Sequence, residues 1–102
     1  MIRHCLFVRF RADVSEAERN AIYADLTAVK DVVPGFVAIS YSANVSPEGL
    51  HQGFEDGFII DFTDEAARDA YLVHPAHKAA GARLVAALEN GRDGLIVFDI
   101  LV

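Results

Sequence analysis

Apolar and polar side chains alternate over the first ten residues of the chain. Residues 2–10 divide into two faces, with Ile2, His4, Leu6, Val8 and Phe10 on one and Arg3, Cys5, Phe7 and Arg9 on the other. A period of two is typical of a β-strand, because successive side chains of an extended backbone point to opposite sides. The sequence therefore predicts a first strand at residues 2–10.

The next stretch has helical periodicity. Ser15 and Glu18 form a capping-box pattern, in which each side chain bonds a free backbone amide at the start of a helix. A continuous apolar stripe follows at intervals of three and four residues: Ile22, Leu26, Val29 and Val33. Pro34 and Gly35 then stop the helix. We expect one helix between Ser15 and Pro34.

Two further strands are predicted at residues 36–45 and 54–62, joined by a polar connection at 46–53. Strict alternation in the first of them separates Val37, Ile39 and Tyr41 from Phe36, Ala38, Ser40 and Ser42. In the second, one face carries Phe54, Asp56, Phe58, Ile60 and Phe62. Asp56 is the single polar member of that face, and a carboxylate near a strand end is usually solvated.

Pro75 divides the last helical stretch in two, because proline has no amide to donate and the residue before it disfavours the helical region. We expect one helix at about residues 65–73, capped by Thr63 or Asp64. A second helix should run from Pro75 to about Glu89, with His74 as its cap. Residues 95–102 supply a final apolar strand.

This order of elements predicts a single α+β domain at residues 1–102, with a ferredoxin-like βαββαβ protomer. Its helices can cover only one face of a four-stranded antiparallel sheet. The other face would carry Cys5, Phe7 and one of two sets from the last strand, either Leu95 and Val97 or Ile96, Phe98 and Ile100. So large an apolar area needs a cover, and we expect a homodimer formed through this sheet face.

Composition narrows the class of protein. The chain is 53% hydrophobic and 24% charged, which is typical of an ordered globular protein that folds without a cofactor. A net charge of −6 opposes binding to nucleic acid or to anionic membranes. No apolar run is long enough to span a bilayer, and residues 1–4 show no signal-peptide pattern, so a cytoplasmic location is expected. The single cysteine, Cys5, is expected to pack as a small apolar side chain.

Candidate chemistry is concentrated in residues 71–78, where a phenol and two imidazoles surround the helix break. With Pro75 as the first helical position, His77 shares a stripe with Gly81, Leu84 and Leu88 and so points toward the sheet. His4 is likewise an inward polar group on an apolar strand face. Together with Tyr71 they predict a small apolar pocket with a few polar groups, the usual form of a ligand site. The candidate ligand-binding residues are His74, Asp56, Leu6 and Phe58.

Each of these residues also has a plainer interpretation. Tyr71 could be a core aromatic with its hydroxyl bonded to backbone, and an inward histidine is more often a satisfied core residue than a catalyst. A metal held by His74 and His77 is disfavoured, because Pro75 lies between them and no third ligand is evident. The sequence has no Gly-rich phosphate loop, no Ser-centred elbow and no Cys cluster.

Four segments together resemble the stress-responsive A/B barrel family. They are Ile2-Arg3-His4-Cys5-Leu6-Phe7-Val8-Arg9-Phe10, Val33-Pro34-Gly35, Tyr71-Leu72-Val73-His74-Pro75-Ala76-His77 and Val97-Phe98-Asp99. The resemblance covers essentially the whole chain, and its Tyr-x-x-His-Pro-x-His element is fairly specific. It implies a dimeric α+β barrel of ferredoxin-like protomers, in agreement with the pattern above.

One enzyme of that family is a cofactor-free polyketide cyclase, and the resemblance implies roles for the matching residues. His77 would be the general base, Tyr71 would hydrogen-bond the developing enolate oxygen, and His4 would orient or polarise the ligand. His74 also matches the cyclase motif. The cyclase has a histidine where this chain has Asp56, and residues 79–81 are small here, so the substrate is not carried over.

Three functions therefore stay open. The first is a homodimeric A/B barrel protein of unassigned activity with a small-molecule pocket between sheet and helices. The second is a cofactor-free cyclase, lyase or isomerase acting on a small oxo compound, and the third is a non-catalytic structural or protective oligomer. An open cavity that reaches Tyr71 and His77 would favour ligand chemistry, whereas a closed, hydrogen-bonded pair would favour a structural role.

Overall fold

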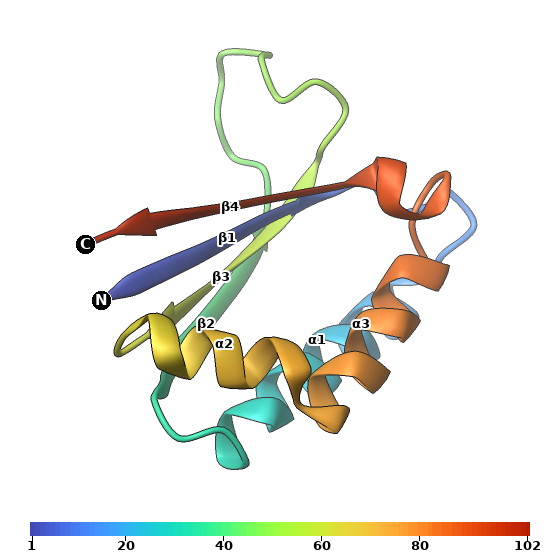
Figure 1. Ribbon diagram of the computed structural model, residues 1–102. Helices are drawn as coiled ribbons and strands as arrows, with labels where there is room; N and C mark the ends of the chain where they lie inside the picture. Colours follow the sequence, from blue (N-terminus) through green and yellow to red (C-terminus); the bar gives the residue numbers. More distant parts are fainter.

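The computed structural model describes all residues, 1–102, as one sheet with helices on one side (Figure 1). The elements in chain order are β1 (Ile2–Val8), α1 (Glu16–Ala28), the 3-10 turn η1 (Val29–Asp31), β2 (Phe36–Ala43), β3 (Asp56–Phe62), α2 (Glu65–Val73), α3 (Pro75–Ala86), the 3-10 turn η2 (Gly91–Gly94) and β4 (Leu95–Leu101). All neighbouring strands are antiparallel, in the order β2-β3-β1-β4. The predicted ferredoxin-like βαββαβ arrangement is confirmed. None of its helices has the length and apolar character needed to cross a membrane.

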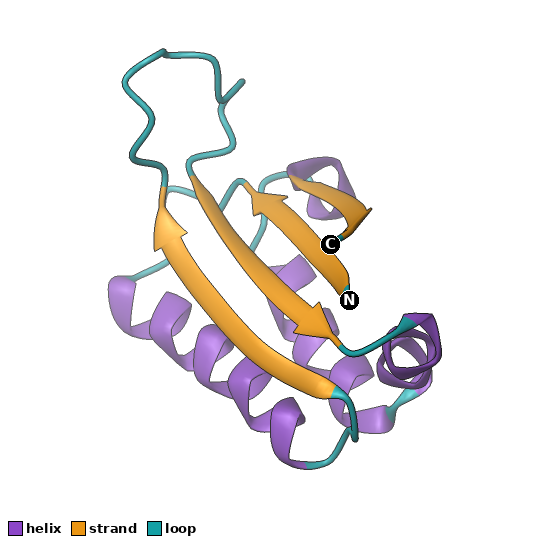
Figure 2. Ribbon diagram, turned by 90° about the vertical axis from the view of Figure 1, so that its left-hand side faces the viewer, coloured by secondary structure: helices purple, strands orange, loops and turns teal.

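The strand register decides which side chains face away from the helices. Cys5 lies opposite Phe98 on β4 and opposite Ile59 on β3, so all three side chains belong to the outer face. Figure 2 shows that the helices cover only the other side of the sheet. The open choice for the last strand is thereby settled in favour of Ile96, Phe98 and Ile100. Phe98 is 61% exposed on this face, which makes it one of the larger uncovered apolar side chains.

Strict alternation in β2 was a wrong expectation for Phe36. The pairing with β3 shifts between Phe36 and Ala38, so that the strand accommodates one extra residue. This β-bulge puts Phe36 on the same inner face as Ile39. Phe36 is buried there, with its ring centroid 5.3 Å from that of Phe62 and 5.7 Å from that of Tyr71.

The core lies between the inner sheet face and the helices. The predicted stripe of α1 and the turn after it is buried throughout, from Ile22 to Val33. The first three strands are each two residues shorter than predicted. Two details of the helices also differ from expectation. Ser15 accepts from the Glu18 amide, but the Glu18 carboxylate binds Arg83 of α3 instead of closing the capping box. Helix α3 ends at Ala86, three residues before Glu89.

A close backbone approach fixes α2 against the sheet. Gly35 has φ +88°, and a Cβ on it would lie 2.5 Å from the Cβ of Ala67. Only glycine accommodates both the left-handed backbone and the contact. Because the turn before β2 can come this near to α2, Tyr71 on that helix reaches the aromatic side chains of β2 and β3.

Candidate functional site

A cavity of about 980 Å³ lies between α3 and the inner side of β1 and β4. Eleven of its sixteen lining residues are hydrophobic, and among them are Leu6, Leu26, Phe58, Leu84, Leu95 and Val97. Val97 is 51% exposed although it points inward, so solvent reaches this wall. The polar groups of the lining are the hydroxyl of Tyr71, which is one of these eleven residues, and the side chains of His4, His77, Lys78 and Arg92. The site is thus largely apolar with a few polar groups, as ligand sites usually are.

The break between α2 and α3 brings Tyr71 and His77 together. His74 has an extended backbone and its Nδ1 accepts from the Ala76 amide at 3.0 Å, while Pro75 begins the next helix. The chain therefore turns between the two helices within one residue. The ring centroids of Tyr71 and His77 lie 4.1 Å apart.

Neither of these two side chains is satisfied within the protein. Tyr71 is only 1% exposed, and its hydroxyl makes no hydrogen bond within the chain. The Nδ1 atom of His77 is buried and has no hydrogen-bond partner. A pair whose function was to lock the helix break would be expected to bond to each other or to backbone.

Burial sets the protonation of both groups. It raises the pKa of the Tyr71 hydroxyl far above its ordinary value, so the phenol keeps its proton. Burial, with the nearby His4, lowers the pKa of His77 below the ordinary histidine value. A neutral imidazole and a protonated phenol therefore face the same cavity near neutral pH.

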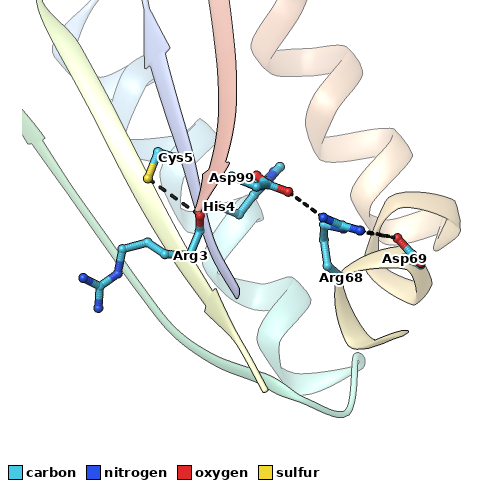
Figure 3. Close-up of polar contacts among 6 residues, drawn as sticks. All are labelled: Arg3, His4, Cys5, Arg68, Asp69 and Asp99. Carbon is cyan, nitrogen blue, oxygen red and sulfur yellow. Dashed lines mark hydrogen bonds and ion pairs between the residues drawn. The ribbon is translucent and has the colours of Figure 1, made fainter. Parts of the chain in front are cut away.

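His4 reaches the cavity from β1, and a hydrogen bond to Asp99 fixes its imidazole ring. Its Nδ1 lies 2.6 Å from Oδ1 of Asp99 on β4, and Arg68 of α2 donates from Nη1 to Oδ2 of Asp99 at 3.0 Å (Figure 3). Burial would raise the pKa of Asp99, but the hydrogen bonds from His4 and Arg68 outweigh it and hold that pKa below its ordinary value. The carboxylate fixes Nδ1 of His4 as a donor, which leaves Nε2 for a ligand.

The structure gathers five of the predicted site residues around the cavity: His4, Leu6, Phe58, Tyr71 and His77. His74 does not line it. That imidazole caps α3, and its hydrogen bond to the Ala76 amide occupies Nδ1. The expectation that His74 binds the ligand is therefore corrected to a role in ending α2 and starting α3.

Asp56 also lies away from this cavity. It lines a separate hollow of about 500 Å³ beside the loop between β2 and β3, together with Phe7 and Ile96. Burial raises the pKa of its carboxyl group. Burial, with a smaller contribution from the charge of Asp56, raises the pKa of Tyr23 to about 12. The placement of Asp56 with the two histidines and Tyr71 was thus wrong, because Asp56 begins β3 opposite Val8, beside the loop between β2 and β3, whereas His4 lies opposite Ile60.

Four further residues of the site were not anticipated: Arg68, Lys78, Arg92 and Asp99. Asp99 had a signal in the sequence, since it is the only acidic residue in the apolar run 95–102. Its register opposite His4 could not be seen without the strand pairing. No group of three or more His, Cys, Asp or Glu side chains is arranged to hold a metal ion.

Comparison with known proteins places the chain in a family. The model of the stress responsive A/B barrel domain matches residues 2–102. The chain belongs to the stress-responsive A/B barrel domain family. An Arabidopsis thaliana relative, the stress-response A/B barrel domain-containing protein HS1, is 28% identical over 76 residues, which are 74% of this chain and 70% of that protein. The resemblance read from the sequence is confirmed.

Solved structures show the same A/B barrel fold. A dimeric ferredoxin-like protein of unknown function from Jannaschia sp. CCS1 superposes with a TM-score of 0.91 at 33% identity, over 99% of this chain and 98% of that one. The hydroxynitrile lyase of Passiflora edulis superposes with a TM-score of 0.86 at 18% identity, over 99% and 92% of the two chains. At that identity the lyase supports the fold alone.

Proposed function

We propose that this A/B barrel protein is a cofactor-free enzyme that removes a proton next to the carbonyl group of a small oxo compound. The observation that supports it most is the open cavity reaching Tyr71 and His77, neither of which is hydrogen-bonded within the protein. An open cavity at these two side chains supports ligand chemistry, whereas a structural lock of the helix break would need them to be hydrogen-bonded. Reaction classes that begin with this step include cyclisation, lyase cleavage and isomerisation.

The chemistry divides between the two side chains. His77, neutral because of its lowered pKa, takes the proton from the carbon beside the carbonyl. Its Nδ1 is buried, so we assign Nε2 as the atom that receives the proton. The electron pair moves onto the carbonyl oxygen, and the Tyr71 hydroxyl donates a hydrogen bond to the resulting enolate. His4, held by Asp99, orients the ligand through Nε2.

We also propose that the protein works as a homodimer formed through the outer sheet face. The outer face presents Phe7, Ile96, Phe98 and Ile100, all at least partly exposed in the single chain. The Jannaschia protein, which shares the fold at 33% identity, is described as dimeric. Burial of these apolar side chains against a second copy stabilises the assembly, and it leaves the cavity free because that cavity opens on the other side of the sheet.

The activity is tested by hydrogen–deuterium exchange at carbon. A panel of aliphatic and aryl ketones is incubated in deuterated buffer with the protein, and loss of the α-proton signal is followed by NMR. We expect faster exchange with the wild type than with His77→Gln for at least one ketone that enters the cavity. If ketones bind but exchange equally fast with both proteins, the activity is refuted and a purely binding or structural role replaces it.

A further inference from the structure

The charges around the cavity differ from those of the chain as a whole. The protein has 15 acidic and 9 basic residues, yet the sixteen residues that line the cavity include two cations and no Asp or Glu. The two cations are Lys78 in the first turn of α3 and Arg92 in η2. A cavity inside an acidic protein is thereby lined by positive charge only.

Neither cation makes a side-chain interaction that stabilises the fold. Four other arginines hold carboxylates of this chain: Arg3, Arg11, Arg68 and Arg83. Arg92 and Lys78 are both exposed, and neither side chain makes an ion pair or a hydrogen bond within the protein. Because both charges lie at the cavity and have no partner in the chain, both are available to an anionic group that enters it.

We infer that the ligand carries a carboxylate in addition to its carbonyl group, and that Lys78 and Arg92 bind that carboxylate. The inference rests on the proposed function, because it places the carbonyl at Tyr71 and His77. The guanidinium of Arg92 matches a carboxylate with two parallel hydrogen bonds, and Lys78 adds a second positive charge. The hydrophobic walls between these groups, such as Leu84 and Val97, receive the carbon chain. The substrate class is therefore an oxo carboxylic acid with an apolar body.

Binding calorimetry with a matched pair of probes tests this assignment. The probes are a nine-carbon γ-oxo fatty acid and its primary amide, which have the same length and carbonyl position and differ in charge. We expect the acid to bind at least about tenfold more tightly than the amide at low salt, with a smaller advantage at physiological salt. The double variant Lys78→Gln/Arg92→Gln should lose this preference and keep the affinity of the wild type for the amide.

Lys30→Gln is the control, because Lys30 in η1 is exposed and does not line the cavity. It should leave the preference for the acid unchanged, and urea unfolding should show all variants to be folded. Equal binding of acid and amide by the wild type would overturn the inference and leave the proposed function standing. A preference that survives in the double variant would also overturn it. If neither probe binds, both proposals fail together.

Discussion

Removal of one oxygen atom from Tyr71 separates a catalytic role from a structural one. In Tyr71→Phe the buried ring is kept and only the hydroxyl is lost. Because that hydroxyl has no hydrogen-bond partner in the protein, its loss breaks no bond. A buried hydroxyl without a partner costs about 1–3 kcal/mol relative to water, but this one reaches a cavity that solvent enters. We therefore expect the free energy of unfolding to stay the same or rise by up to about 1 kcal/mol.

The same variant should lose most of the activity. Removal of one donor to a developing oxyanion typically slows an enzyme by about 10²–10³-fold, and we expect α-proton exchange to slow by about that factor. Urea unfolding followed by circular dichroism measures the stability, and NMR measures the exchange of a bound ketone.

Tyr23→Phe is a matched control for this experiment. Tyr23 is also a buried tyrosine whose hydroxyl has no partner, but it does not line the cavity. Its variant should match Tyr71→Phe in stability and leave the exchange rate unchanged. The reasoning is refuted if Tyr71→Phe loses more than about 1 kcal/mol of stability while the exchange rate stays at the wild-type level, since the hydroxyl would then be a structural bond.

Three further changes test other parts of the account. Asp99→Asn should lower the free energy of unfolding at neutral pH by about 1–3 kcal/mol. The difference in stability between wild type and variant should shrink in acid. It falls once the pH drops below 3.8, the ordinary carboxyl pKa, and through the lower pKa that Asp99 has in the folded protein. Urea unfolding over a pH series measures this. Phe98→Glu places a charge on the outer sheet face, and analytical ultracentrifugation should show monomers where the wild type shows dimers. Gly81→Ala should stabilise α3 by up to about 1 kcal/mol, because alanine is the better helix former. Its methyl group, 3.8 Å from Cε1 of His77, should at the same time weaken ketone binding measured by calorimetry.

Most of the fold could be predicted from the sequence, because local sequence signals and the burial of side chains indicate the same elements along most of the chain. The alternation that starts at Ile2 predicts a strand, and the proline after His74 predicts a helix break; the structure has the strand at Ile2–Val8 and the break at His74. The bulge in β2 was not readable, since Phe36 fits strict alternation equally well on either face. Its inner position is decided by packing against aromatic side chains from two other elements, which no local pattern contains.

Part of the site could be predicted from the sequence, where its residues lie close together along the chain. Tyr71 and His77 lie six positions apart, on either side of one helix break, so helical geometry alone could place them together. Arg92 lies in the turn before β4 and lines the cavity, whereas Asp99 meets His4 only through strand pairing. Both come from segments far along the chain from Tyr71 and His77. Asp56 was misplaced because a shared strand face does not say how far along that face two residues lie.

The pH dependence of α-proton exchange tests the central claim most directly. If His77 is the base, the exchange rate of a bound ketone should rise as this imidazole loses its proton, with a midpoint below the ordinary histidine value of 6.5, and then stay level through neutral pH. His77→Gln should abolish that rise. A rate that climbs with hydroxide concentration alone, identically in wild type and variant, would contradict the account.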